Sequence, residues 1–142
     1  MRLNPNYICL DFEKGLINAA KNQFRKAKLF GCLFHWMQSI RRCMISLGVK
    51  KDQVSYSTTK NVLDILTMIP KNEIVKKGAP HAKHDIESMG LTSEDRQKWS
   101  TFWTCFSKFW LSSSFFIGLW NIADNNDEEN EIHSRVNNGL ER

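Results

Sequence analysis

The sequence predicts a mixed α/β fold, with two strands near the N-terminal end and helices over most of the remaining residues. Two apolar runs, residues 7–10 and 27–33, predict the strands, because strands buried on both faces read as continuous hydrophobic runs. Between them, Ile17, Ala20 and Phe24 recur at helical spacing on one face, together with Leu16. A strand, a helix and a second strand within about thirty residues are typical of a parallel βαβ unit.

Helical spacing continues in the later sequence. A second helix is expected from residue 35 or 36 to Gly48, a residue type that favours helix ends, and residues 50–52 are expected to form a charged turn. A third helix is expected from a cap at residues 57–59 to Pro70, which breaks it.

Two shorter signals follow along the chain. Residues 73–77 predict a short helix, and Gly78-Ala79-Pro80 predicts a break. Residues 91–94 offer an N-cap for a long helix with the heaviest aromatic stripe of the chain. The stripe consists of Trp99, Phe102, Trp103, Phe106 and Trp110. It predicts core packing, with stacking on nucleic-acid bases as the alternative.

These elements divide the chain into four segments. Residues 1–48 form a partial α/β core, 49–123 an all-helical region, 124–131 an acidic loop, and 132–142 the start of a further helix. Two strands do not make a complete α/β domain, since a parallel sheet needs more strands and cover on both faces. We therefore expect the chain to be a piece of something larger.

Composition and charge narrow the class of protein. Hydrophobic residues make up 42% of the sequence, which is enough for a packed core and excludes a disordered chain. Residues 1–111 hold 18 Lys and Arg against 9 Asp and Glu, whereas residues 112–142 hold 2 against 6. The basic body suits a polyanionic partner such as DNA.

The cysteines and the apolar segments indicate the compartment. Four cysteines without regular spacing favour a reduced, intracellular setting, and the N-terminal residues show no secretory signal. The apolar segment 109–120 is interrupted by serines and is shorter than the roughly 20 residues of a membrane span. We expect an intracellular protein without a membrane partner.

Asp11, in the sequence Asp11-Phe12-Glu13, is the first candidate functional residue. It directly follows the first predicted strand, and open α/β sheets bind ligands at the carboxyl ends of their strands. The side chain then either binds a metal ion there or caps the following helix, as Asp does well.

Cys32-x-x-His35 is the second candidate, because both residue types bind zinc at this spacing. Tetrahedral zinc needs four ligands, and 45 residues separate this pair from the other local pair, His81-x-x-His84. The spacing therefore disfavours zinc. The alternative is a buried cysteine with a histidine near a helix start.

Four motifs taken together resemble the back half of a Mutator-like element (MULE) transposase. Their order and spacing match that family across nearly the whole chain. The motifs are Asp11-Phe12-Glu13, then Gly31-Cys32-Leu33-Phe34-His35-Trp36, then Phe109-Trp110-Leu111 with Leu119-Trp120-Asn121, and finally Arg135-x-Asn137-Asn138-x-x-Glu141.

The resemblance implies a ribonuclease-H-like catalytic core, begun by residues 1–48, with residues 49–123 as its helical insertion and 132–142 as the start of its last catalytic helix. In such a DDE-type core, two Asp and one Glu hold divalent metal, Mg or Mn, for DNA strand cleavage and joining. Asp11 matches the second Asp and Glu141 the final Glu, both as catalytic residues and metal ligands. Cys32 and His35 match a motif that we interpret as structural or substrate-positioning.

The resemblance also implies DNA as the partner and the nucleus as the location, and it allows a homo-oligomer. Arg41, Arg42, Lys50 and Lys51 are the expected contacts to the DNA backbone, which position the duplex without reading its sequence. We expect the chain to lack the family's first catalytic Asp, and therefore to be a transposase fragment or remnant that is inactive alone. The alternative is a domesticated, non-catalytic module that binds DNA or protein.

Overall fold

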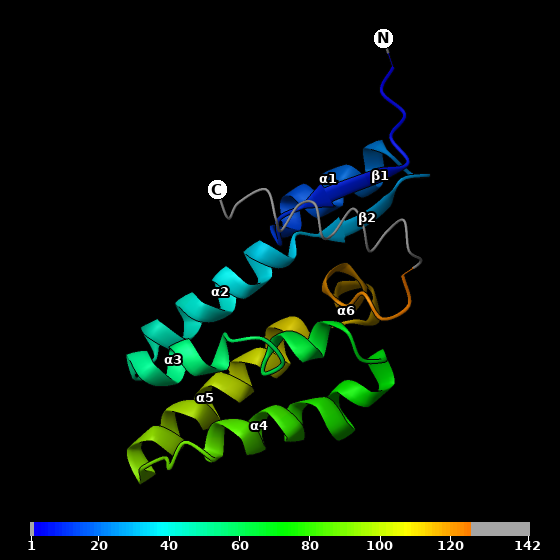
Figure 1. Cartoon of the computed structure of the whole chain (residues 1–142). Helices are drawn as coiled ribbons and strands as arrows, with labels where there is room; N and C mark the ends of the chain where they lie inside the picture. Colours follow the sequence, from blue (N-terminus) through cyan, green and yellow to red (C-terminus); the bar gives the residue numbers. More distant parts are fainter. Residues whose placement is uncertain (1, 126–142) are drawn as a thin grey trace.

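The computed structural model describes residues 2–125, in which a small sheet with one helix adjoins a larger helical body (Figure 1). The predicted mixed α/β class is confirmed: the chain is mostly helical and carries a two-stranded parallel sheet. Within residues 2–125, no helix combines the length and apolar character that crossing a membrane requires.

In chain order the elements are β1 (Tyr7–Leu10), α1 (Lys14–Gln23), β2 (Lys28–Gly31), α2 (Leu33–Ser46), α3 (Lys51–Ser57), the 3-10 helices η1 (Asp64–Thr67) and η2 (Lys71–Glu73), the π-helical turn η3 (Ile74–Gly78), α4 (Ala79–Glu87), α5 (Ser93–Trp110) and α6 (Ser114–Trp120).

The two strands form the predicted parallel βαβ unit with α1 as the crossover helix. Tyr7 pairs with Lys28, and the register continues to Leu10 opposite Gly31. Ile17 and Ala20 of α1 are buried, but Leu16, which was expected on the same face, is 42% exposed. Successive helix positions differ by about 100°, so Leu16 turns away once Ile17 faces the sheet.

Helix α2 begins earlier than predicted, and the strand before it is shorter. Cys32 has extended backbone angles and is the N-cap, so the helix starts at Leu33 and not at residue 35 or 36. Its end is as predicted: Gly48 has a φ of +76°, a left-handed conformation that favours glycine. The Gly48 N–H donates to the Ile45 carbonyl and the Val49 N–H to the Met44 carbonyl, which closes the helix end.

The predicted turn at 50–52 and the predicted helix from 57–59 to Pro70 are wrong. A helix, α3, already starts at Lys51 and ends at Ser57, and the 3-10 helix η1 follows. The Ser57 and Thr58 hydroxyls donate to the Val54 carbonyl at 2.9 Å, so these residues close a helix end and do not open a helix. Apolar residues of this segment still reach the core, since Val62 and Leu66 are buried.

The predicted break at residues 78–80 is also wrong, because η3 continues directly into α4. Pro80 lies in the first turn of α4, directly after the π-helical turn, and it does not end the helix there. Gly78 is buried, and a Cβ there would come within 2.2 Å of the Ile69 side chain. This glycine allows close packing and does not interrupt the chain.

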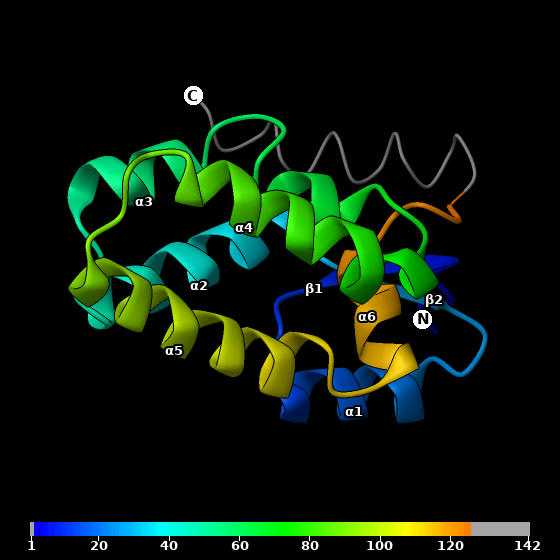
Figure 2. The ribbon, with the colours of Figure 1, turned by 90° about the horizontal axis from the view of Figure 1, so that it is seen from below.

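Helix α5 begins with the predicted cap. The Asp95 N–H donates to Thr92 Oγ1 and the Thr92 N–H donates to Asp95 Oδ2, each at 3.1 Å, which is a capping box. The five residues of the aromatic stripe are all buried, so the core interpretation is confirmed. Figure 2 shows α4 and α5 running alongside each other, and the Arg96–Glu87 ion pair connects them.

An aromatic cluster holds α2, α5 and α6 together. Trp36 of α2 is stacked on Trp120 of α6, with ring centroids 5.3 Å apart, and Trp110 and Phe106 of α5 meet it edge-on. Trp120 Nε1 donates to the Trp110 carbonyl at 3.0 Å. Trp36 Nε1 finds no hydrogen-bond partner among residues 2–125.

A buried carboxylate joins α3 to α5. Asp95 is 2% exposed, and Lys50 at the start of α3 lies 3.3 Å from its Oδ1. Trp99 Nε1 of α5 donates to Gln53 Oε1 of α3 at 3.0 Å. Hydrogen bonds, above all that from the Thr92 backbone N–H, lower the pKa of Asp95 to about 2.

We expect Asp95 to make stability pH-dependent in acid. Its pKa in the folded chain, about 2, is below the ordinary 3.8, so its stabilising contribution is complete above 3.8 and is lost as the pH falls towards 2. Urea unfolding measured between these values tests this, with Asp95→Asn expected to flatten the dependence. Asp52→Asn, at an exposed carboxylate of α3, is the control. An Asp95→Asn chain with the full wild-type slope would contradict the prediction.

Candidate functional site

The carboxyl edge of the sheet brings together two of the predicted site residues. Asp11 follows β1 and Cys32 follows β2, and the parallel register, with Leu10 opposite Gly31, places both at the same edge. The Cys32 N–H donates to the Leu10 carbonyl at 2.8 Å, which extends the pairing beyond the strands. This is the edge at which open α/β sheets bind ligands.

Asp11 is exposed, and it does not cap α1 directly. The N-cap of α1 is Glu13, and Asp11 Oδ1 accepts a hydrogen bond from the Glu13 N–H at 3.2 Å. This short turn leads the chain from the strand into the helix. The prediction of Asp11 as the N-cap is therefore wrong by two residues, although the side chain does bind backbone at the helix start.

Phe12 packs between the carboxyl edge of the sheet and the helical body. The sequence did not indicate this role. A Cβ at Gly31 would lie 2.1 Å from Phe12 Cζ, so the ring occupies space that only a glycine leaves open. The ring also meets Trp110 and Phe116 edge-on, at centroid distances of 4.9 Å and 5.9 Å. Gly31 was the available signal, because a glycine within a strand marks a close approach.

Cys32 and His35 differ in their surroundings. Cys32 is 4% exposed, and the thiol of Cys9 on the neighbouring strand lies beside it. Burial, with a smaller effect of Cys32, raises the pKa of Cys9 to about 11, so Cys9 remains a thiol at neutral pH. His35 is exposed in the first turn of α2, where its ring meets Phe34 edge-on at 5.7 Å.

The described residues do not assemble a metal site. Within residues 2–125, no three His, Cys, Asp or Glu side chains are grouped to hold an ion, so Cys32 and His35 do not form a four-ligand site with His81 and His84. Asp11 has suitable chemistry for Mg or Mn, but one carboxylate provides too few ligands. Glu141, the other predicted metal ligand, lies outside the described residues, as do residues 126–142 generally.

The predicted DNA contacts lie along α2 and at its far end. Arg41 and Arg42 are exposed and make no ion pair with another described residue. Lys51 is exposed at the start of α3, whereas Lys50 is paired with Asp95. Because α2 has 14 residues, Lys50 and Lys51 lie roughly 20 Å along the helix from the Asp11 edge.

Comparison with known proteins adds no family to this geometry. No protein-family model, curated protein or solved structure matches the chain. Its function is therefore inferred from its residues: a carboxylate and a thiol at one sheet edge, an aromatic cluster behind that edge, and exposed arginines on the adjoining helix.

We expect Gly31→Ala to destabilise the fold by about 1–3 kcal/mol, because the added methyl displaces the Phe12 ring from Trp110 and Phe116. Gly15→Ala is the matched control, since its Cβ would meet only Glu13 Oε1, at 3.7 Å, within α1. That change is expected to be neutral or stabilising by up to about 1 kcal/mol. Urea unfolding of both variants measures the difference, and equal stability of the two variants would count against the role of Phe12.

Proposed function

We propose that this chain is a segment of a Mutator-like element transposase. In this proposal β1, α1 and β2 belong to a ribonuclease-H-like core, and the helices after α2 form the helical insertion of that core. The retained activity is sequence-independent DNA binding.

One observation carries the proposal: three of the four motifs behind the resemblance meet in one aromatic cluster. Phe12 comes from the first motif, Trp36 from the second, and Trp110 and Trp120 from the two blocks of the third. The centroids of Phe12 and Trp110 are 4.9 Å apart, those of Trp36 and Trp110 6.1 Å, and those of Trp36 and Trp120 5.3 Å. These motifs are therefore neighbours in space, although they lie up to about a hundred residues apart in the sequence. The fourth motif, with Glu141, lies outside the described residues.

Charge supports DNA as the partner. Residues 2–125 hold 18 Lys and Arg against 10 Asp and Glu, a surplus that attracts a polyanion. Arg41 and Arg42 are exposed at successive positions of α2, and guanidinium binds phosphate through paired hydrogen bonds. Such contacts position a duplex without reading its bases.

Duplex binding by the full chain tests the proposal. We expect the dissociation constant to rise steeply with salt, and Arg41→Glu with Arg42→Glu to reduce the slope of its logarithm against the logarithm of salt by about 0.9 for each lost phosphate contact. Lys60→Glu with Lys76→Glu, at two exposed positions on other elements, is a control with the same change in charge. Fluorescence anisotropy of a labelled duplex measures both. Absence of binding at low salt, or a flat salt dependence, would reject DNA binding.

A nicking assay tests whether the chain is an active nuclease or is inactive alone, as both the proposed transposase segment and the alternative of a domesticated, non-catalytic module require. We expect the chain with Mg or Mn to nick supercoiled plasmid no faster than Asp11→Ala, because no three His, Cys, Asp or Glu side chains among the described residues are grouped to hold a metal ion around Asp11. Asp11→Ala is also expected to bind duplex like the unchanged chain. Metal-dependent nicking that disappears in Asp11→Ala would instead make the chain an active nuclease.

A further inference from the structure

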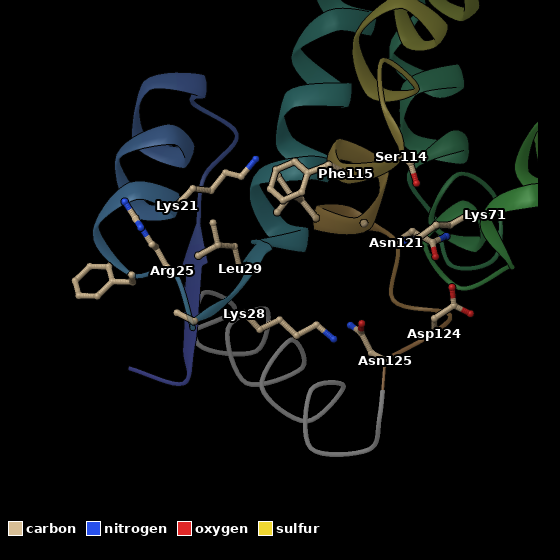
Figure 3. A pocket seen from close by; sticks show the side chains of 14 residues that line it. Lys21, Arg25, Lys28, Leu29, Lys71, Ser114, Phe115, Asn121, Asp124 and Asn125 are labelled. Atoms are coloured by element: carbon tan, nitrogen blue, oxygen red, sulfur yellow. The ribbon is translucent and has the colours of Figure 1, made fainter. Parts of the chain in front are cut away.

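A hollow of about 620 Å³ opens at the amino end of β2, the opposite end of the strand from the Asp11 edge (Figure 3). Its walls come from the second half of α1, the turn into β2, the 3-10 helix η2 and helix α6. Segments about fifty residues apart, around Lys21 and Lys71, therefore face one space. None of the predicted site residues within 2–125 lines it.

The lining is strongly cationic. Lys21, Arg25, Lys28 and Lys71 contribute four positive groups, and among the described residues Asp124 is the one acid in the lining. Lys21, Arg25 and Lys71 make no ion pair with another residue in the part of the chain that the structure describes. Like charges gathered in a concave surface focus a positive potential, which favours an anionic ligand.

Two further features suit a ligand that is both charged and aromatic. Phe115 is 44% exposed at the wall of the hollow, and Lys21 Nζ lies 3.7 Å from its ring centroid. A Cβ at Gly118 would come within 3.2 Å of Lys71 Nζ, so the glycine leaves room for the ammonium group. Cations beside an exposed ring are the combination with which proteins hold single-stranded nucleic acid.

A second hollow provides a contrast. It has about 670 Å³ and lies between α4 and α5, and it contains an ion pair, Arg96 with Glu87 at 2.6 Å. Arg25 and Lys71 of the first hollow make no ion pair with another described residue. Size alone therefore does not distinguish the first hollow, but these two cations do.

We propose that the hollow lined by Lys21, Arg25, Lys71 and Phe115 binds a nucleotide unit of a single strand of DNA, with its phosphates at the cations and its base against Phe115. Its volume lies in the range of small-ligand sites and is too small for a duplex. This site is separate from the Arg41 and Arg42 surface on α2. The inference rests on the proposed DNA-binding function and adds the form of DNA that this end of the sheet accepts.

Anisotropy titrations of the full chain with a labelled oligothymidylate of about six nucleotides test the assignment. Arg25→Glu with Lys71→Glu is expected to weaken strand binding about tenfold or more, whereas the control Lys60→Glu with Lys76→Glu changes it much less. Phe115→Ala, which alters no charge, is expected to weaken it about fivefold through lost stacking. Gly118→Ala is expected to weaken it by displacing the Lys71 ammonium. Circular dichroism melting of each variant checks that it remains folded.

The outcomes separate this inference from the proposed function. Strand binding that is equal in the pocket and control variants overturns the inference, while salt-dependent duplex binding through Arg41 and Arg42 would still stand. If the chain binds inorganic tripolyphosphate but not the oligothymidylate, the hollow is a site for a free phosphate compound. That result would overturn the proposal that it binds single-stranded DNA. If the unchanged chain binds neither duplex nor single-stranded DNA, both the proposed function and this inference are rejected.

Discussion

The stacking of Trp36 on Trp120 is the contact on which the other features of the structure depend. Trp36 lies in the first turn of α2, only five residues after β2 ends, and it is 1% exposed. Trp120 is fully buried, and its indole N–H is held by the carbonyl of Trp110 at the end of α5. Any shift of α5 or α6 would therefore move α2, and with α2 the edge of the sheet that carries Asp11 and Cys32. Phe12 and Gly31 connect the same cluster to the strands from the other side.

The sequence predicts correctly those parts of the fold that depend on residues close together in the chain, and it fails where packing between distant residues decides. The strands, the end of α2 at Gly48 and the cap of α5 at Thr92 follow from residues a few positions apart, and they were predicted. Residues 57–59 were misassigned because hydroxyl side chains bind backbone at either end of a helix, and the choice is made by packing. Ser57, for example, also donates to Met44 Sδ in α2, at 3.3 Å. The prediction of a break at Gly78 is wrong because the close contact that explains this glycine, with the Ile69 side chain, lies nine residues away in the sequence.

The candidate site divides in the same way. Parallel pairing of the two strands alone places Asp11 and Cys32 at the same edge of the sheet. The sequence was therefore sufficient to predict this placement. The pairing of Lys50 with Asp95 joins residues 45 positions apart, and nothing near Lys50 indicates it. The cationic hollow likewise needs Lys21 and Lys71 to be brought together by α6, a helix with no charged residue of its own. Charge counts indicated a polyanionic partner, but only the packing of α6 against β2 indicates where that partner would lie.

The two ends of the sheet therefore have opposite chemistry. Asp11 and Glu13 present exposed carboxylates at the carboxyl edge, whereas Lys21, Arg25 and Lys71 line the hollow at the amino end. Strands of four residues separate these ends by roughly 13 Å, somewhat more than a Debye length at physiological salt. A polyanion held at the amino end is thus largely screened from the repulsion of Asp11. The carboxylates of Asp11 and Glu13 remain accessible to a cation. At the amino end, such a cation would compete with lysine and arginine for the same phosphates. Separation along the strands lets one small sheet carry both kinds of group without either neutralising the other.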